Sequence, residues 1–357
     1  MTTTENRTTA GPLRRSPGAT APLIREAWYV LAARSEFGQD LRQRWILGEP
    51  VCFYEAEDGG LIALDDRCAH RRFPLSRSLR IGDTIRCSYH GFTYGKDGRC
   101  LAVPGASPGD ITVRSYPTLQ RGPWVWIWTG RNPQDADPAL IPWPAETEGG
   151  HSVTGYTINP CNYLMVHENL LDLTHLEFLH GFGVSDFTET ALALLPPDEL
   201  PDGFTELAVG YRKDLHTVLG GYALPTGDDP STPVFHSTRT MSVTPAINYA
   251  VQSFEPTDPA AAKLRTVVMA HCLTPADDDS THQFWMAWQD VPFTVDPIEH
   301  AQRFETIFNE DVAALGWIQE HVERDTREGV VEHSVPADVP GLRLRRLLHR
   351  LAAAETR

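Results

Sequence analysis

Two cysteines and two histidines constrain what residues 68–90 can form. They occur as Cys68-x-His70 and, after sixteen intervening residues, Cys87-x2-His90. Four ligands of these types at this spacing bind either a zinc ion or a [2Fe–2S] cluster. Each segment supplies one thiolate and one imidazole, so one iron can take both sulfurs and the other both ring nitrogens. Zinc motifs more often use Cys-x2-Cys with separate histidines. The pattern therefore favours the cluster, and zinc is the alternative.

The residues around this quartet have the pattern of a small all-β domain. Short apolar runs pair across turns containing Asp-Gly, which is a hairpin signal, and a Trp-rich run follows them. The expected strands are 51–54 with 61–64, 92–94 with 100–103, and 124–128. We expect Cys100 to belong to the core of this domain rather than to the metal site. The loop at Pro104-Gly105 is placed to shield the site from water.

A second set of metal ligands lies in the stretch 159–183. Its middle is rich in Leu and Met, which predicts a helix, and glycines at 181 and 183 predict the end of that helix. On helical spacing Asp172 lies one turn before His175, and His180 falls in the last turn, where it can converge with His175. Two histidines and a carboxylate are the ligands of a non-haem Fe(II) site. The alternative is an amphipathic helix with structural histidines.

Composition limits the other classes of function. The 357 residues suffice for two domains, and 41% hydrophobic with 22% charged residues is typical of a globular protein. A net charge of −16 argues against binding to nucleic acid or to an anionic membrane surface. No apolar run is long enough to span a membrane. Six dispersed cysteines do not form a disulfide framework and favour a cytoplasmic location.

The predicted fold class is α+β, in three segments. Residues 1–22 are expected to be a disordered tail, 23–140 the all-β domain, and 141–357 a second domain with an antiparallel sheet flanked by helices. Strands of that sheet are expected at 246–254, 264–272 and 282–288. A long helix is expected over 297–326, followed by a short amphipathic helix. Segment 184–235, rich in proline, is a candidate for a mobile lid.

Both motifs resemble those of the Rieske non-haem iron oxygenases, the ring-hydroxylating family. Cys-x-His-Arg-x-x-Pro-Leu from Cys68 and Cys-x2-His-Gly from Cys87 resemble the signature of the Rieske [2Fe–2S] domain. Asn169-x-x-Asp172-x-x-His175-x4-His180 resembles the mononuclear iron motif. The order of the two domains also agrees, and the Asn-Leu-Leu-Asp-Leu-Thr-His run is most similar to the vanillate O-demethylase and dicamba monooxygenase branch.

The family takes its third iron ligand from an aspartate on a late helix, and the sequence offers Asp311. In the helix over 297–326, Phe304, Phe308, Leu315, Ile318 and Val322 mark an apolar stripe, and Asp311 falls within it. A buried carboxylate needs a cationic partner, which iron on His175 and His180 would supply. A buried pair with an arginine, or a capping role, is the alternative.

The resemblance implies a complete redox system. Electrons from NAD(P)H would reach the cluster through a separate ferredoxin reductase and pass to Fe(II), where O2 is the co-substrate. Asp172 would bridge a ligand histidine and a cluster histidine of the adjacent subunit, in a homotrimer. Asn169 would be a further contact near the iron. The expected reaction is hydroxylation or O-demethylation of a small, aromatic molecule. Hydroxylation of a ring or alkyl carbon in a natural product is the runner-up, followed by a Rieske electron carrier and a zinc-binding module.

Overall fold

The computed structural model describes residues 21–143, 147, 149–180, 193–194, 209–218, 233–257, 265–293, 295–324 and 332–356. Most of the candidate lid at 184–235 lies outside these residues, as do residues 1–20 of the predicted tail. Ala21 is buried, and the carbonyl of Pro22 accepts a hydrogen bond from the Tyr163 hydroxyl at 2.8 Å. The last two residues assigned to the tail are therefore part of the packed structure.

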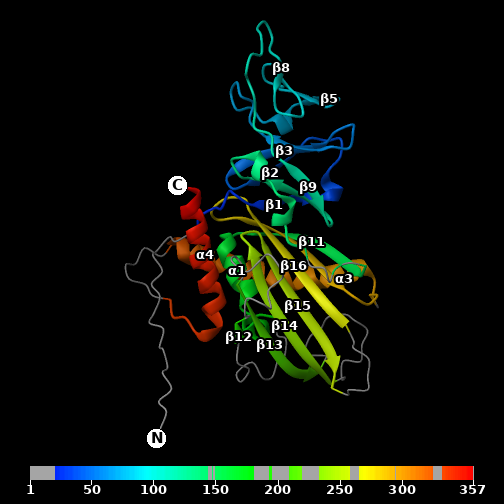
Figure 1. The fold of residues 1–357 in the computed structure, drawn as a ribbon, viewed down its shortest axis with the longest axis vertical. Helices are drawn as coiled ribbons and strands as arrows, with labels where there is room; N and C mark the ends of the chain where they lie inside the picture. Colours follow the sequence, from blue (N-terminus) through cyan, green and yellow to red (C-terminus); the bar gives the residue numbers. More distant parts are fainter. Residues whose placement is uncertain are drawn as a thin grey trace.

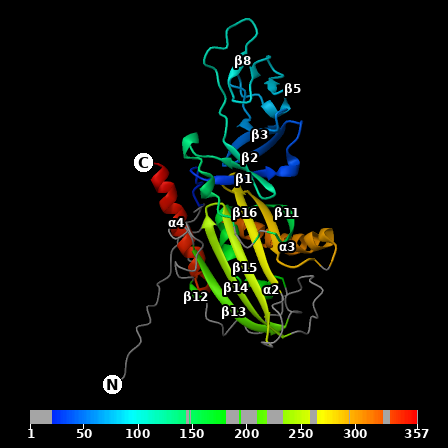
Figure 2. The same ribbon diagram turned by 45° about the vertical axis from the view of Figure 1, so that its right-hand side comes forward.

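Three small antiparallel sheets form the N-terminal part, at the upper end of Figures 1 and 2. The first has the order β1-β10-β9, from strands Trp28–Ala33, Trp124–Trp128 and Thr118–Arg121. The second is β2-β3-β4, from Arg42–Ile46, Glu49–Glu55 and Leu61–Asp65. The third is β5-β6-β7-β8, from Leu79–Ile81, Thr84–Arg86, Thr93–Tyr94 and Cys100–Ala102. Both predicted hairpins and the Trp-rich strand are confirmed.

A seven-stranded antiparallel sheet forms the larger part, in the order β11-β17-β16-β15-β14-β13-β12. Its strands are His151–Asn159 (β11), Ala193–Leu194 (β12), Val209–Val218 (β13), Pro233–Thr244 (β14), Ile247–Pro256 (β15), Arg265–Pro275 (β16) and Thr281–Gln289 (β17). The three strands expected from the sequence correspond to β15, β16 and β17. The predicted α+β class is confirmed.

Four α-helices accompany this sheet in the described residues: Tyr163–Leu171 (α1), His175–Phe178 (α2), Pro297–Arg324 (α3) and Val339–Glu355 (α4). Helix α4 pairs with α1 through Arg345, whose guanidinium donates two hydrogen bonds of 2.8 Å to the Glu168 carboxylate. None of the helices in the described ranges is both long and apolar enough to cross a bilayer.

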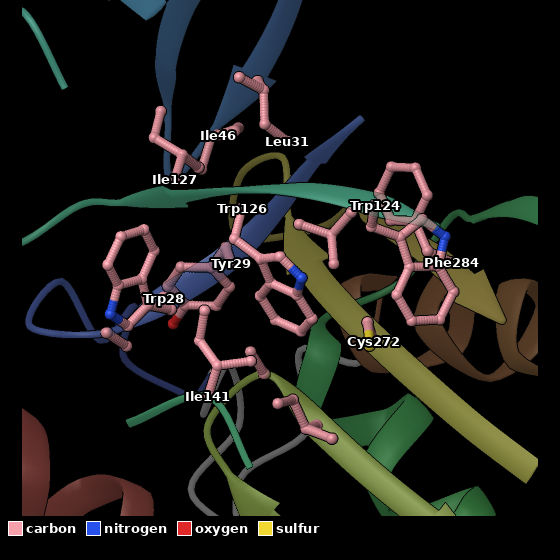
Figure 3. Packing of buried hydrophobic residues seen from close by; sticks show 14 of the residues in the cluster. Trp28, Tyr29, Leu31, Ile46, Trp124, Trp126, Ile127, Ile141, Cys272 and Phe284 are labelled. Carbon is pink, nitrogen blue, oxygen red and sulfur yellow. The ribbon is translucent and has the colours of Figure 1, made fainter. Parts of the chain in front are cut away.

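One hydrophobic core joins the two parts of the chain. Trp124 and Trp126 on β10 pack in the same cluster as Cys272 on β16 and Phe284 on β17. Figure 3 shows these side chains gathered where β1 and β10 cross the end of the large sheet. Aromatic residues bury large areas, roughly 150–250 Å² each, so the packing fixes the small sheets against the large one.

The opposite face of the large sheet carries a second core. Residues directly opposite one another in antiparallel strands share a face, and Asn248, His271 and Trp285 are aligned in this way across β15, β16 and β17. Helix α3 covers this face, with Phe304 and Phe308 packed against Trp285. The sheet thus separates an apolar interface with the N-terminal part from a face that reaches the candidate metal ligands.

The predicted stripe on α3 is correct only in its first half. Phe304, Phe308 and Leu315 are buried, whereas Ile318 is 49% exposed. Gln319 is buried in its place and accepts a hydrogen bond from the backbone N–H of Asn162 at 3.2 Å. The sequence period was read over the whole helix. Leu315 still packs with Leu273 of β16, but beyond it α3 contacts the residue that caps the start of α1.

Candidate metal centres

The first centre is formed by two loops closed in the same way. In one loop the N–H of Cys68 donates to the carbonyl of Phe73 and the N–H of Arg72 donates to the carbonyl of Cys68. In the other the N–H of Cys87 donates to Phe92 at 2.8 Å, and the N–H of Gly91 donates to Cys87 at 2.9 Å. The two loops therefore present their cysteines from equivalent positions, whereas His70 lies two residues after Cys68 and His90 lies three residues after Cys87.

Backbone conformation explains the glycine in the second loop. Gly91 has φ +76°, which is strained for other residues, and a Cβ there would lie 3.2 Å from the Pro104 ring. Arg72 adopts φ 57° at the matching position of the first loop. The Pro104 loop thus packs against the second ligand loop, as the sequence indicated. Cys100 is buried in β8, in the core as expected.

The quartet is divided into an inner pair and an outer pair. Both cysteines are 2% exposed, whereas His70 and His90 are exposed, with ring centroids 4.6 Å apart. The Tyr94 hydroxyl lies 3.2 Å from the Cys68 sulfur. Buried thiolates, outer imidazoles and a hydrogen bond to sulfur fit a [2Fe–2S] cluster with mixed ligands.

The same geometry does not fit zinc. A tetrahedral zinc site would bring its ligand atoms within about 4 Å of one another, because zinc bonds are about 2.0–2.3 Å long. Among the described residues, the one set with three ligand atoms within 4.8 Å of each other is His175, His180 and Asp311. No three ligand atoms of the Cys/His quartet meet this criterion, which favours a two-iron cluster over a single zinc ion.

The second centre is built on a break between α1 and α2, which corrects the expected continuous helix. Helix α1 ends at Leu171, and Asp172 has φ −108° and ψ 105°. Its carboxylate accepts hydrogen bonds from the Thr174 N–H at 2.8 Å and the Thr174 hydroxyl at 2.7 Å. Asp side chains favour such local hydrogen bonds over a helical conformation, and the chain turns there.

This turn changes how His175 is held. We expected the Asp172 carboxylate to contact the His175 ring, but the carbonyl oxygen of Asp172 lies 2.5 Å from His175 Nδ1 instead. A carbonyl accepts only, so Nδ1 carries the proton and Nε2 is the metal-binding atom. The second oxygen of the Asp172 carboxylate has no partner among the described residues.

His180 presents the same ring atom from the other side. Its Nδ1 lies 2.7 Å from Glu310 Oε2, and its Nε2 lies 3.3 Å from Asp311 Oδ1. His175 Nε2 lies 3.5 Å from the same oxygen. Bonds of about 2.0–2.2 Å to one metal place neighbouring ligand atoms about 3 Å apart, so the three residues are arranged to share an ion.

Asp311 enters this group from α3 with a side chain that is 13% exposed. Asn169 Nδ2 donates to its Oδ1 at 3.1 Å. Within the described part of the chain its partners are His175, His180 and Asn169, and no arginine pairs with it. Asn169 is therefore placed to orient the third ligand.

The electrostatics of the two histidines suit metal binding. Burial lowers the pKa of His175 despite the nearby Asp311 carboxylate, which favours the neutral imidazole that binds metals. For His180 burial acts in the same direction, but hydrogen bonds to Asp311 and Glu310 outweigh it and raise the pKa. A metal ion at this position would replace that proton, since both carboxylates also stabilise a cation there.

A cavity opens directly beside this centre. It lies between the sheet and helices α1, α2 and α3, and Asn169, His175, His180 and Asp311 form its metal side. Apolar and amide side chains form the rest, namely Leu170, Leu173, Leu176, Asn248, Ala250, Gln252, Met269, His271, Phe304, Ile307 and Phe308. One histidine of the central sheet, His271 on β16, is among these lining residues.

Glu310 is a candidate site residue that the sequence analysis did not identify. It lies off the apolar stripe of α3, and its side chain is 46% exposed. Glu310 directly precedes Asp311 on α3. A residue next to one metal ligand on a helix can contact a second ligand, here His180, at the ring atom that does not face the metal position. That signal is too common to identify such a residue without the tertiary structure.

We expect Glu310→Ala to weaken Fe(II) binding at the second centre by about 10–100-fold, because His180 loses the group that orients its ring. Glu310→Gln keeps an acceptor and should recover most of the affinity. The measurement is chelator competition for the mononuclear iron, with cluster absorbance as the check on folding. Glu320→Ala, which removes a surface partner of Arg324 on the same helix, is the control. Unchanged iron affinity in Glu310→Ala would refute this role.

Two family models match the chain. Residues 27–117 match the Rieske [2Fe-2S] domain, and residues 160–354 match the vanillate O-demethylase oxygenase C-terminal domain. The first range contains all four cluster ligands, and the second contains His175, His180 and Asp311.

Curated proteins and solved structures agree with this. The dicamba O-demethylase oxygenase component of Stenotrophomonas maltophilia is 37% identical over 162 residues, covering 44% of this chain and 48% of the relative. The vanillate O-demethylase oxygenase subunit of Pseudomonas sp. (strain HR199 / DSM 7063) is 34% identical over 164 residues, with 45% and 46% covered. The matched segments thus span about half the length of these curated relatives.

The crystal structure of dicamba monooxygenase bound to 3,6-dichlorosalicylic acid superposes with a TM-score of 0.79 and 25% identity. It covers 94% of this chain and 99% of that one. With both centres and both family models in the same order, the chain belongs to the Rieske non-haem iron oxygenases, in the family defined by the vanillate O-demethylase oxygenase C-terminal domain.

Proposed function

We propose that this chain is the terminal oxygenase component of a multicomponent monooxygenase that O-demethylates or hydroxylates an aromatic compound. The observation that carries the proposal is the cavity bounded on one side by His175, His180 and Asp311. Three protein ligands on one side of an ion leave positions open toward the cavity. When bound, the mononuclear iron supplies O2 activation and the cluster supplies electrons.

The chain's own residues prepare the site before any substrate enters. The Asp172 carbonyl and the Glu310 carboxylate hold the two imidazoles with Nε2 inward, and Asn169 holds Asp311. Leucines of α1 and α2 and phenylalanines of α3 exclude water from the opposite wall. Fixed ligands and an apolar wall restrict the reaction to a substrate held beside the ion.

Electrons come from NAD(P)H through a separate ferredoxin reductase, the partner protein of this proposal. O-demethylation consumes one aryl methyl ether, one O2, two electrons and two protons. It yields a phenol, formaldehyde and water. Hydroxylation of the methyl carbon gives a hemiacetal, which breaks its bond to the aryl oxygen as the proton moves to that oxygen.

The two centres of one chain lie in different parts of the molecule. Figures 1 and 2 both show strands β5 and β8 at the far tip, beyond the sheets β1-β10-β9 and β2-β3-β4, whereas α1 and α3 flank the large sheet. This separation supports electron transfer between subunits of a homotrimer, from the cluster of one subunit to the mononuclear centre of the next.

The surfaces near the two centres are complementary in charge. A second cavity of about 390 Å³ lies on the outer side of α1, where Asp172 and His175 are accessible, and it also contains Glu332 and Asp338. Exposed arginines surround the cluster loops, at Arg71, Arg72, Arg77 and Arg86. Opposite charges at two surfaces favour their association, which supports Asp172 as the contact between subunits.

Hydroxylation of a ring or alkyl carbon in a natural product is the second candidate reaction and uses the same centre. A Rieske electron carrier or a zinc-binding module would leave the second centre and its cavity without a role. The division of the chain near residue 140 and a cytoplasmic location stay predictions.

The test is product analysis with the purified protein and a reconstituted reductase over methoxylated and non-methoxylated aromatics. We expect formaldehyde and a phenol in equal amounts, each dependent on O2 and NAD(P)H. A hydroxylated product without formaldehyde would select the second candidate reaction. Iron-loaded protein that oxidises none of these compounds while accepting electrons would refute the proposed function.

A further inference from the structure

An amide oxygen beside the metal-side cavity has no hydrogen-bond partner. Asn248 on β15 lines the cavity and is 1% exposed, and its Oδ1 has no partner among the described residues. A buried acceptor without a donor is unfavourable in the free protein. A ligand that brings a donor to this atom removes that penalty, and the atom therefore indicates what the cavity selects.

A chain of hydrogen bonds decides which end of the Asn248 amide is available. The carbonyl of Pro245 only accepts, so His167 Nε2, 3.1 Å away, carries the proton. Burial lowers the pKa of His167 to about 4, so the ring is neutral and its Nδ1 is unprotonated. Nδ1 therefore accepts a hydrogen bond from the Ser242 hydroxyl at 3.0 Å. Ser242 Oγ then accepts from Asn248 Nδ2 at 3.3 Å.

Rotating the amide by half a turn would break this chain. It would place Asn248 Oδ1 against Ser242 Oγ. Because the single hydroxyl hydrogen of Ser242 already forms the hydrogen bond to His167, two acceptors would face each other. The backbone carbonyl of Pro245 thus fixes the amide through two side chains. Nδ2 faces Ser242, so Oδ1, a hydrogen-bond acceptor, is the amide atom that remains available to a ligand.

Apart from the metal ligands, the other polar groups of the described lining are uncharged. Gln252, four residues further along the same face of β15, has Oε1 without a partner in the described structure. Burial lowers the pKa of His271 to about 4, so this cavity residue is neutral. No lysine or arginine occurs among the described lining residues. Arg265, further along this face, lies over the Phe254 ring at 4.8 Å and is not part of the lining.

We propose that the cavity takes a substrate whose hydroxyl or N–H group donates a hydrogen bond to Asn248 Oδ1. That bond positions the substrate beside His175, His180 and Asp311. The proposal rests on the proposed oxygenase function and narrows its substrate class. A carboxylate in the same place would set its own acceptor oxygens against Asn248 Oδ1 and Gln252 Oε1, which also accept only.

The test is equilibrium binding to the intact iron-loaded protein, measured calorimetrically without O2. The probes are methoxyphenols, dimethoxybenzenes and methoxybenzoates, each as the ortho, meta and para isomers. The best methoxyphenol should bind about tenfold or more tightly than its matched dimethoxybenzene and methoxybenzoate, because those two lack the donor. Equal or tighter binding of either donor-free probe overturns the proposal.

Variants locate the effect at one atom. Asn248→Leu should reduce the preference for the methoxyphenol over the dimethoxybenzene to less than about threefold. Ser242→Ala removes the acceptor that holds Nδ2, so the amide can turn its donor inward and the discrimination against methoxybenzoate should fall. Ser253→Ala, on the other face of β15, is the control and should keep the wild-type preference. An unchanged preference in Asn248→Leu refutes the assignment of Asn248 Oδ1 as the acceptor. If Asn248→Leu does not fold, Ser242→Ala and the wild-type binding series test the same assignment.

Binding and turnover separate this inference from the proposed function. Donor-selective binding without any oxidised product would refute the oxygenase function but keep the inference. Formaldehyde release with equal efficiency from donor-free ethers would keep the function and refute the inference.

Discussion

Asp311→Ala is expected to lose the mononuclear iron and turnover together, while the Rieske cluster remains. Asp311 Oδ1 is the atom that both His175 Nε2 and His180 Nε2 face, at 3.5 and 3.3 Å. Removing it leaves two neutral imidazole ligands and no anionic ligand to bind Fe(II) directly. Iron per chain should fall from about three to about two, with about two sulfides unchanged, because the cluster keeps its two irons. Product formation should fall by at least about a hundredfold, since the centre that activates O2 is absent.

Two further variants make this result specific. Asp311→Asn keeps the volume and the contact with Asn169 but removes the charge, and it should also lose most of the iron. Glu320→Ala removes an exposed carboxylate of the same helix, 49% exposed and paired with Arg324, and should behave as the wild type. Normal iron content and turnover in Asp311→Ala would reduce Asp311 to a structural residue.

Asp172→Asn is expected to keep both metal centres and yet slow electron transfer between them by orders of magnitude. The asparagine can still accept from Thr174 through its side-chain oxygen, so the turn between α1 and α2 should persist. It loses the second carboxylate oxygen, which has no partner among the described residues. In stopped-flow experiments a reduced cluster should therefore stay reduced in the presence of substrate and O2.

Mixed oligomers test whether this transfer crosses a subunit boundary. Cys68→Ser chains lack the cluster but keep an intact mononuclear centre, whereas Asp172→Ala chains keep both centres but cannot accept electrons at the mononuclear centre. Each alone should be inactive. At equal mixing, one interface in four pairs an intact cluster with an intact acceptor, so about a quarter of the wild-type activity should return in a cyclic oligomer. Verified mixed oligomers without rescue, or fast cluster reoxidation in Asp172→Asn, would contradict the intersubunit route.

The sequence by itself determined the identity of both centres. A cluster needs thiolates and imidazoles at fixed local spacing, and Cys68, His70, Cys87 and His90 lie on two short loops where spacing along the chain is close to spacing in space. The strands around them were readable for the same reason, since hairpins are local structures. His175 and His180 are also near in sequence, and both were identified from their spacing.

The tertiary structure decided how each ligand is held. The break after α1 arises because Asp172 hydrogen-bonds to Thr174, and helical periodicity cannot register that competition. Because of this break, the Asp172 carboxylate does not contact the His175 ring, and His175 Nδ1 donates instead to the backbone carbonyl of Asp172. Every residue has a backbone carbonyl, so the residue type does not reveal this contact. Glu310 reaches His180 across 130 residues of sequence, so no local pattern identifies it.

The selectivity of the cavity was equally beyond sequence reasoning. The orientation of Asn248 depends on Ser242, His167 and the carbonyl of Pro245, which come from a strand, a helix and a turn. Residue spacing predicts which side chains share a face of a strand or helix. The direction of each hydrogen bond here depends instead on the next group in the chain: the Pro245 carbonyl sets the proton on His167, and His167 sets the direction of the Ser242 hydroxyl. Metal ligands can therefore be predicted from the spacing of residues along the chain. The chemistry of the substrate pocket depends on contacts between residues that are distant in sequence, which only the tertiary structure provides.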